Sequence, residues 1–127
     1  MKVRECFLQA VAIVGVEREA REAWSAMNRI NSPWAAVFDE NRLVGVVNKK
    51  DLDEFLRVPE IFQKVGEVAK TDMPSRRGIS LSPNADLNES VLQLEMAGAD
   101  AAFVAGVGRP PGIMELAAAN RALSCSS

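Results

Sequence analysis

The sequence lacks residue types that catalytic and metal-binding sites commonly use. Its 127 residues include no histidine and no tyrosine, and only two cysteines, Cys6 and Cys125, which lie near opposite ends. This composition argues against a zinc site and against a Cys–His nucleophile pair. We also find no other nucleophile with a spaced base. We therefore expect a protein that is not an enzyme and that binds no metal.

The net charge is also small, and long apolar runs are absent. The 15 Lys and Arg residues against 17 Asp and Glu residues give a net charge of −2, which provides no basic field for a nucleic-acid backbone. No window approaches 18 uninterrupted apolar residues, and the N-terminus lacks the pattern of a signal peptide. We therefore expect a cytoplasmic protein that binds neither nucleic acid nor a membrane.

What the sequence does contain is an internal repeat. Residues 34–52 predict a strand, a turn, a second strand and the start of a helix, and a similar pattern returns 67 positions later, in residues 101–116. Gly45 and Gly112 mark this offset. A repeat of this length, with strand and helix signals in each copy, indicates two copies of one supersecondary unit. We place the copies at residues 1–62 and 63–127.

Each copy predicts a strand, a helix, two strands and a helix. The expected elements of the first copy are a strand over 10–16, a helix over 20–30, strands over 35–38 and 43–47, and a helix over 49–57. Those of the second copy are a strand over 79–81, a helix that begins after Asp86, strands over 101–104 and 112–114, and a helix over 116–123, with a connection through Pro110 and Pro111 and a frayed tail from Ser124. This order predicts a mixed α/β (α+β) fold in which two small sheets pack face to face. The interface would leave a cleft between the copies, built from strand ends and helix starts.

Part of the first copy resembles a known signature. An apolar strand ends at Asp39, a turn follows, and residues 43–52 have the pattern Gly-apolar-x-Asn-x-x-Asp-Leu. This run is similar to the central signature of the cystathionine β-synthase (CBS) domain, which has Thr or Ser at the position of Asn48. The second copy resembles it through Phe103-Val104 and Gly112-Ile113-Met114. The resemblance implies a tandem CBS-domain pair, or Bateman module, with pseudo-twofold symmetry.

The resemblance also implies a function. Such pairs bind AMP, ADP, ATP, S-adenosylmethionine or a related adenosyl ligand in the cleft between the repeats, and they regulate a neighbouring domain or an unknown partner protein. A homodimer is expected. By this resemblance, Asp51 would hold the ribose hydroxyls, and Asn48 would meet a phosphate or ribose oxygen. The full set of residues that it implies for ligand binding is Asp51, Asn48, Lys49, Ile79, Ser80, Ala101, Ala102, Arg77 and Trp34.

The second copy departs from the signature. Ala118 occupies the position equivalent to Asp51, and Glu115 the position equivalent to Asn48, so the ribose contact is absent there. Asp100 lies where a basic residue is common in this family, and its charge would oppose a phosphate. We therefore expect one usable site at most.

Several alternatives remain open. Asn48 and Asp51 form an Asn-x-x-Asp pattern that can serve only as a helix cap. Trp34 can fill the edge of a core instead of stacking on a base, and Arg76-Arg77 can be a solvated pair. The chain as a whole can be a dimerisation or partner-binding module that has lost its ligand.

Overall fold

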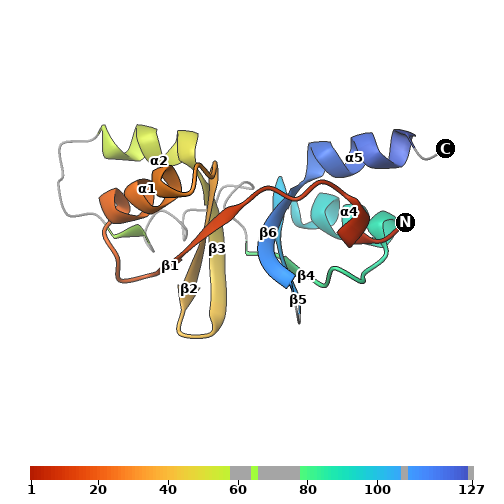
Figure 1. Cartoon of the computed structure of the whole chain (residues 1–127), viewed down its shortest axis with the longest axis horizontal. Helices are drawn as coiled ribbons and strands as arrows, with labels where there is room; N and C mark the ends of the chain where they lie inside the picture. The colour runs from red at the N-terminus through yellow and green to blue at the C-terminus, as the bar shows by residue number, and fades with distance from the viewer. Residues whose placement is uncertain (58–63, 66–77, 107–108, 126–127) are drawn as a thin grey trace.

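The structure, a computed structural model, describes residues 1–57, 64–65, 78–106 and 109–125. Two lobes lie side by side, each with helices on the outer side of a small sheet (Figure 1). The first lobe contains β1 (Val11–Gly15), α1 (Ala20–Arg29), β2 (Trp34–Asp39), β3 (Arg42–Asn48) and α2 (Lys49–Leu56). The second contains β4 (Ser80–Leu81), α4 (Leu87–Ala97), β5 (Ala101–Gly106), β6 (Arg109–Glu115) and α5 (Leu116–Cys125). A short 3₁₀ helix, η1 (Val3–Glu5), precedes the first lobe.

The two sheets have the same topology. Their strand orders are β1-β2-β3 and β4-β5-β6, with the first pair parallel and the second pair antiparallel in each. Each hairpin carries a register shift at the same place, after Val37 in β2 and after Val104 in β5. The predicted mixed fold of two like units is therefore confirmed.

Two details of the prediction were wrong. Pro110 and Pro111, which were expected in a connection, lie within β6. β6 is the last strand in the order of its sheet, and proline is tolerated there because an edge strand has N–H groups that need no partner. The helix α5 extends through Ser124 to Cys125, where a frayed tail was expected.

Each lobe has its own core, formed where helices cover one face of the sheet. In the first lobe, α1 buries Ala20, Ala23 and Met27. In the second lobe, α4 buries the face formed by Leu87, Val91 and Leu94. The spacing of three and four residues along both helices produces these apolar faces.

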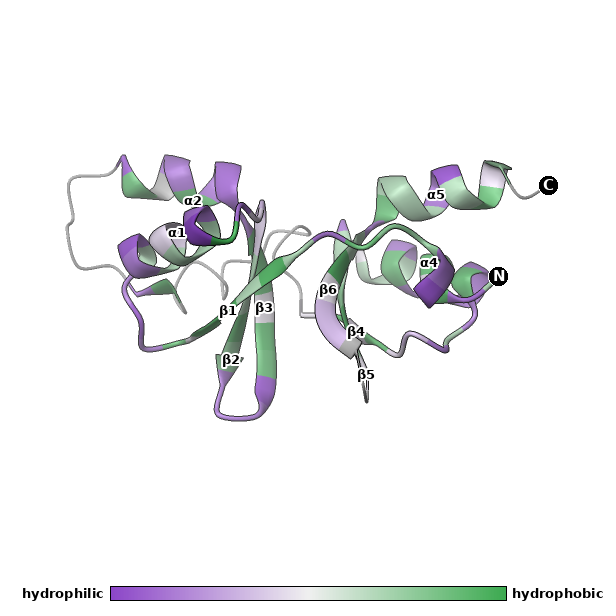
Figure 2. Ribbon diagram, viewed as in Figure 1, coloured by the Kyte–Doolittle hydropathy of each residue, from purple (hydrophilic) through white to green (hydrophobic). Residues whose placement is uncertain are grey.

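A third cluster lies between the two sheets and joins the lobes. This inter-sheet cluster contains Val11, Trp34, Ala36, Val46, Ala101, Phe103 and Ile113, with Phe38 and Leu43 packed against it. The rings of Phe38 and Phe103 meet edge to face, with centroids 5.3 Å apart. Hydrophobic residues dominate β1, β2 and β3, whereas the tip of the β2–β3 hairpin and the first part of β6 are hydrophilic (Figure 2). The expected packing of sheet against sheet is thus observed.

The N-terminal segment crosses to the second lobe. Val3 donates a backbone hydrogen bond to the carbonyl of Ala85 over 2.9 Å, and its side chain is fully buried in the second core. The segment before the second lobe does the reverse, since Val65 donates to the carbonyl of Arg18 over 2.8 Å and is buried in the first core. Each lobe therefore receives a segment that precedes the other lobe in the chain. Backbone hydrogen bonds thus cross the predicted boundary between residues 62 and 63 in both directions. That boundary describes the sequence repeat and stays a prediction.

Candidate functional site

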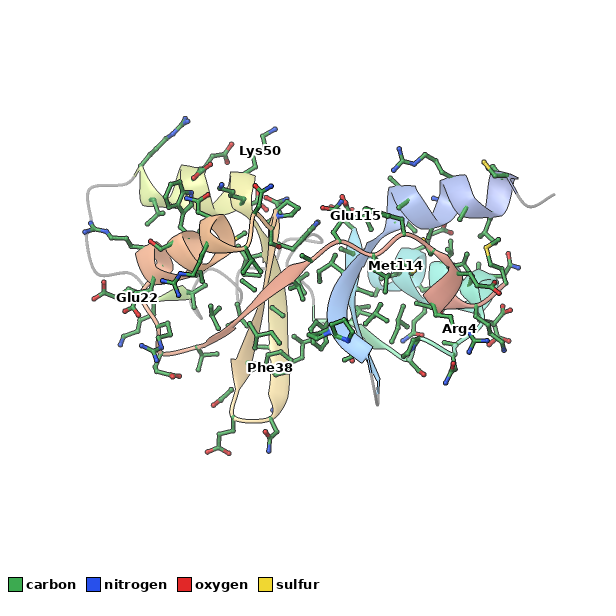
Figure 3. All side chains as sticks on the ribbon, viewed as in Figure 1. Arg4, Glu22, Phe38, Lys50, Met114 and Glu115 are labelled. Atoms are coloured by element: carbon green, nitrogen blue, oxygen red, sulfur yellow. The ribbon has the colours of Figure 1, made fainter. Side chains whose placement is uncertain are left out.

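The cleft between the lobes is formed where β3 and β6 end and the helices α2 and α5 begin. Lys49 donates a backbone hydrogen bond to the carbonyl of Pro33, and Leu116 donates one to the carbonyl of Asp100, both over 2.8 Å. These two bonds join positions that are 67 residues apart, so the repeat reproduces the local backbone geometry. Lys50 and Glu115, near the two helix starts, lie on the same side of the molecule (Figure 3).

Two cavities open at this cleft. The first has a volume of about 440 Å³, and the second about 410 Å³. Five residues of the first, Pro33, Asn48, Lys49, Lys50 and Asp53, correspond at the offset of 67 to five residues of the second, Asp100, Glu115, Leu116, Ala117 and Asn120. The cavities are therefore two versions of one site, one in each repeat.

Both cavities also share walls near the middle of the cleft. Trp34, Asn48 and Glu115 line both. Trp34 is only 5% exposed and belongs to the inter-sheet cluster, so the core holds its side chain in place at the border of the cavities. Its burial fits the first of the two alternatives that the sequence left open, a core residue, and stacking on a base stays a prediction.

Asn48 forms the helix cap that the sequence indicated. Its Oδ1 accepts the backbone N–H of Asp51 over 2.8 Å, at the start of α2. This bond satisfies one of the N–H groups that a helix start leaves without an intrahelical partner. The side-chain amide of Asn48 has further hydrogen-bonding capacity, since its nitrogen is a donor. A contact to a ligand at the cavity is therefore compatible with the cap.

Two charged side chains of the first cavity also contact residues of α1. Lys49 donates through Nζ to Asn28 and lies 5.2 Å from the centroid of the Trp24 ring. Asp53 accepts a hydrogen bond from Nε1 of Trp24. These contacts tie α2 to α1 and draw both charges toward the first lobe. Lys50 is exposed to solvent beside them.

The second cavity has a different electrostatic character. Its lining includes the carboxylates of Asp100 and Glu115 and no lysine or arginine among the described residues. Leu116 and Ala117 replace the two lysines of the first cavity. An anionic ligand is therefore disfavoured in the second cavity relative to the first.

The other described residues that the resemblance implied do not line the first cavity. Ala101 is buried in the inter-sheet cluster and Ala102 in the second core, so only their backbones can meet a ligand. Ile79 accepts the N–H of Phe103 through its carbonyl, and the next residue, Ser80, is exposed.

The last two residues of the implied set are Asp51 and Arg77. Asp51 is partly buried and lines neither of the two cavities. Arg77 lies outside the described residues. The structure thus brings together Asn48, Lys49 and Trp34, and the role of the remaining residues stays a prediction.

Sequence reasoning missed Gln9, Pro33 and Asp53 as cavity residues. Pro33 could have been found by applying the repeat offset to Asp100, whereas Asn120, the equivalent of Asp53, gave no signal of its own. Gln9 could not have been found in this way, because it reaches the cleft through a backbone pairing with Ile113 far away in sequence.

Two further features bear on the classes of function. None of the described helices is long and apolar enough to cross a membrane. Over the same residues, no group of three potential metal-binding side chains gathers in one place.

Comparison with known proteins identifies the fold. No protein-family model matches the sequence, and no curated protein matches it significantly. Among solved structures, the chain is similar to the CBS domain of a bacterial CNNM/CorC family Mg²⁺ transporter in complex with ATP, with a TM-score of 0.69, 16% identity, and coverage of 98% of this chain and 87% of that chain. It is also similar to a putative acetoin utilization protein from Vibrio cholerae, with a TM-score of 0.62, 19% identity, and coverage of 99% and 91%. A CBS domain pair/ACT domain protein from Thermotoga maritima matches with a TM-score of 0.60, 21% identity, and coverage of 99% and 98%. The chain therefore has the fold of a CBS-domain pair.

Proposed function

We propose that this CBS-domain pair is a non-enzymatic regulatory module that binds an adenosine-containing ligand in the cleft between its repeats. The observation that carries the proposal is the pair of equivalent cavities at the starts of α2 and α5, both lined by Trp34. A structural neighbour with the same fold holds ATP, which supports a ligand of this class. AMP, ADP, ATP and S-adenosylmethionine are the first candidates.

The proposed mechanism is a population shift. Residues from both repeats, Trp34 and Asn48 from the first and Glu115 from the second, line the same cavities. A ligand bound there would favour the relative setting of the lobes in which both walls contact it. A partner that reads this setting would then respond to the ligand.

Thermal-shift and calorimetric titrations with the four candidates test the proposal. Binding should raise the melting temperature with ligand concentration, because the ligand binds only the native state. Asp51→Asn should weaken binding, since Asp51 is the residue proposed to hold the ribose. Glu54→Gln is the matched control, because Glu54 is exposed on the same helix and the change removes the same charge. No response to any candidate would overturn the proposal.

Fluorescence gives an independent measurement. Trp34 and Trp24 are the two tryptophans of the chain. In a Trp24→Phe variant, the remaining emission comes from Trp34 at the cavity wall. A ligand in the cleft should change this emission with the same midpoint as the calorimetric titration.

A second candidate function is a ligand-free module for dimerisation or partner binding. Ala118 and Glu115 in place of the signature residues favour it. The helix α4 also exposes Leu92 and Met96, with 59% and 89% of their surfaces accessible, which supports a contact with another chain. Native mass spectrometry of the purified protein would separate the two functions, because it reports both copurified nucleotide and subunit number.

A further inference from the structure

Glu115 occupies a central position between the two cavities. It is the last residue of β6 and lines both of them, together with Trp34 and Asn48. Its partner in the β5–β6 ladder is Ala101, whose small side chain leaves Glu115 without a bulky neighbour on that strand. A ligand in either cavity therefore lies close to this carboxylate.

The charges around Glu115 do not neutralise it equally on the two sides. In the second cavity Asp100 adds a second carboxylate, and no described lining residue is cationic. In the first cavity the lining contains Lys49 and Lys50 together with Asp53 and Glu115. Lys49 contacts Asn28 and Trp24, and Asp53 contacts Trp24, but these partners are neutral and leave both charges in place. Two lysines beside two carboxylates provide little net attraction for a group with several negative charges.

We propose that Glu115 selects the ligand by charge, so that the cleft takes a nucleoside with a neutral or cationic 5′ substituent in preference to a nucleoside polyphosphate. A sulfonium nucleoside such as S-adenosylmethionine has this chemistry. Its positive sulfur would be attracted by the carboxylate, whereas the phosphates of ATP would be repelled. This inference rests on the proposed function, because it narrows the ligand of the same cleft.

Calorimetric titrations of the wild-type chain with adenosine, S-adenosylmethionine and ATP, in the absence of divalent cations, test the inference. Wild-type protein should bind S-adenosylmethionine at least about tenfold more tightly than ATP. Glu115→Gln keeps the shape and removes the charge, so it should raise the affinity for ATP by about tenfold, lower that for S-adenosylmethionine, and leave that for adenosine unchanged. The gain for ATP should shrink as ionic strength rises.

Glu95→Gln is the control for net charge, because Glu95 is exposed on α4 and does not line either cavity. Thermal unfolding of both variants checks that they are folded. Equal effects of the two substitutions, or wild-type binding of ATP as tight as that of S-adenosylmethionine, would overturn the inference and leave the proposed function intact. Failure of wild type and variants to bind any of the three compounds would overturn both.

Discussion

At the residue scale, the contribution of Asn48 to stability can be measured without a ligand. Its Oδ1 accepts the N–H of Asp51 at the start of α2. Asn48→Ala removes this bond and should lower the free energy of unfolding by about 1 kcal/mol. Urea denaturation measures the change, as a shift in midpoint at constant slope.

Asn48→Asp is the matched control for this prediction. Aspartate is also a good cap, so its effect on the free energy of unfolding should stay within a few tenths of a kcal/mol. Equal stability of Asn48→Ala and the wild type would show that the cap contributes nothing. If Asn48→Ala retains ligand binding, the contribution of Asn48 to the helix cap is separate from ligand binding.

The sequence predicted the candidate site only in part. Asn48 and Lys49 were accessible to prediction because they lie in a continuous motif at a helix start. Glu115 was identified as a departure from the signature, but its place between two cavities depends on how the lobes pack. Such placement has no local signal in the chain, since it is created by contacts between residues far apart.

At the element scale, the strands that form the inter-sheet cluster complement each other in size. Trp34 of β2 corresponds to Ala101 of β5, and Ala36 corresponds to Phe103. All four residues belong to the one cluster between the sheets, where two large side chains at equivalent positions would compete for limited space. Pairing a large residue with a small one fills the interface at native density.

This complementarity predicts a coupling between positions 36 and 103. Phe103→Ala should cost about 3–5 kcal/mol by leaving a cavity, and Ala36→Phe should cost about 1–3 kcal/mol by overpacking. The double variant moves the ring to the equivalent position, so its loss of stability should be smaller than the sum of the two by at least about 1 kcal/mol. Denaturation of all four proteins, analysed as a double-mutant cycle, gives the coupling energy.

Met96→Ala is the control for the stability measurements, because Met96 is 89% exposed and should change the free energy of unfolding by less than about 0.5 kcal/mol. Strict additivity of Ala36→Phe and Phe103→Ala would show that the two positions do not share space.

Most helices and strands could be predicted from the sequence because hydrophobic periodicity is local. The face of α1 and the capping of α4 by Asp86, which accepts the N–H of Glu89 over 3.1 Å, both follow from short-range patterns. The prolines of β6 misled the prediction, since tolerance of proline depends on whether a strand lies at the edge of its sheet.

At the scale of the whole molecule, the exchange of segments between lobes was not predictable from the pattern. It is carried by backbone hydrogen bonds, such as those of Val3 to Ala85 and Val65 to Arg18, which any residue except proline can donate. Close approach of the N-terminal segment to β6 also contributes to the exchange. A Cβ added at Gly112 would lie 3.1 Å from Cβ of Leu8 and 3.2 Å from the carbonyl oxygen of Gln9, so glycine lets the N-terminal segment approach β6.

The exchange predicts that a substitution near the N-terminus loosens the second lobe. Val3→Ala removes apolar atoms that are fully buried in the second core, and it should lower the free energy of unfolding by about 2 kcal/mol. Hydrogen exchange should quicken at Leu87, whose N–H is bonded to the carbonyl of Met1, more than at residues of the first lobe. Phe7→Ala is the control, because Phe7 is 73% exposed and contributes little to that core.

The reactivity of the two cysteines provides a second measurement of the loosening of the second lobe. Cys6 is buried in the second core, and burial raises the pKa of its thiol, whereas Cys125 is exposed. Because the thiolate is the reactive form, alkylation of Cys6 requires opening of the segment, while Cys125 reacts directly. Val3→Ala should therefore speed alkylation of Cys6 by roughly the factor of 30 that corresponds to about 2 kcal/mol, and leave Cys125 unchanged. Unchanged labelling of Cys6 would mean that the N-terminal segment opens independently of the core that Val3 enters.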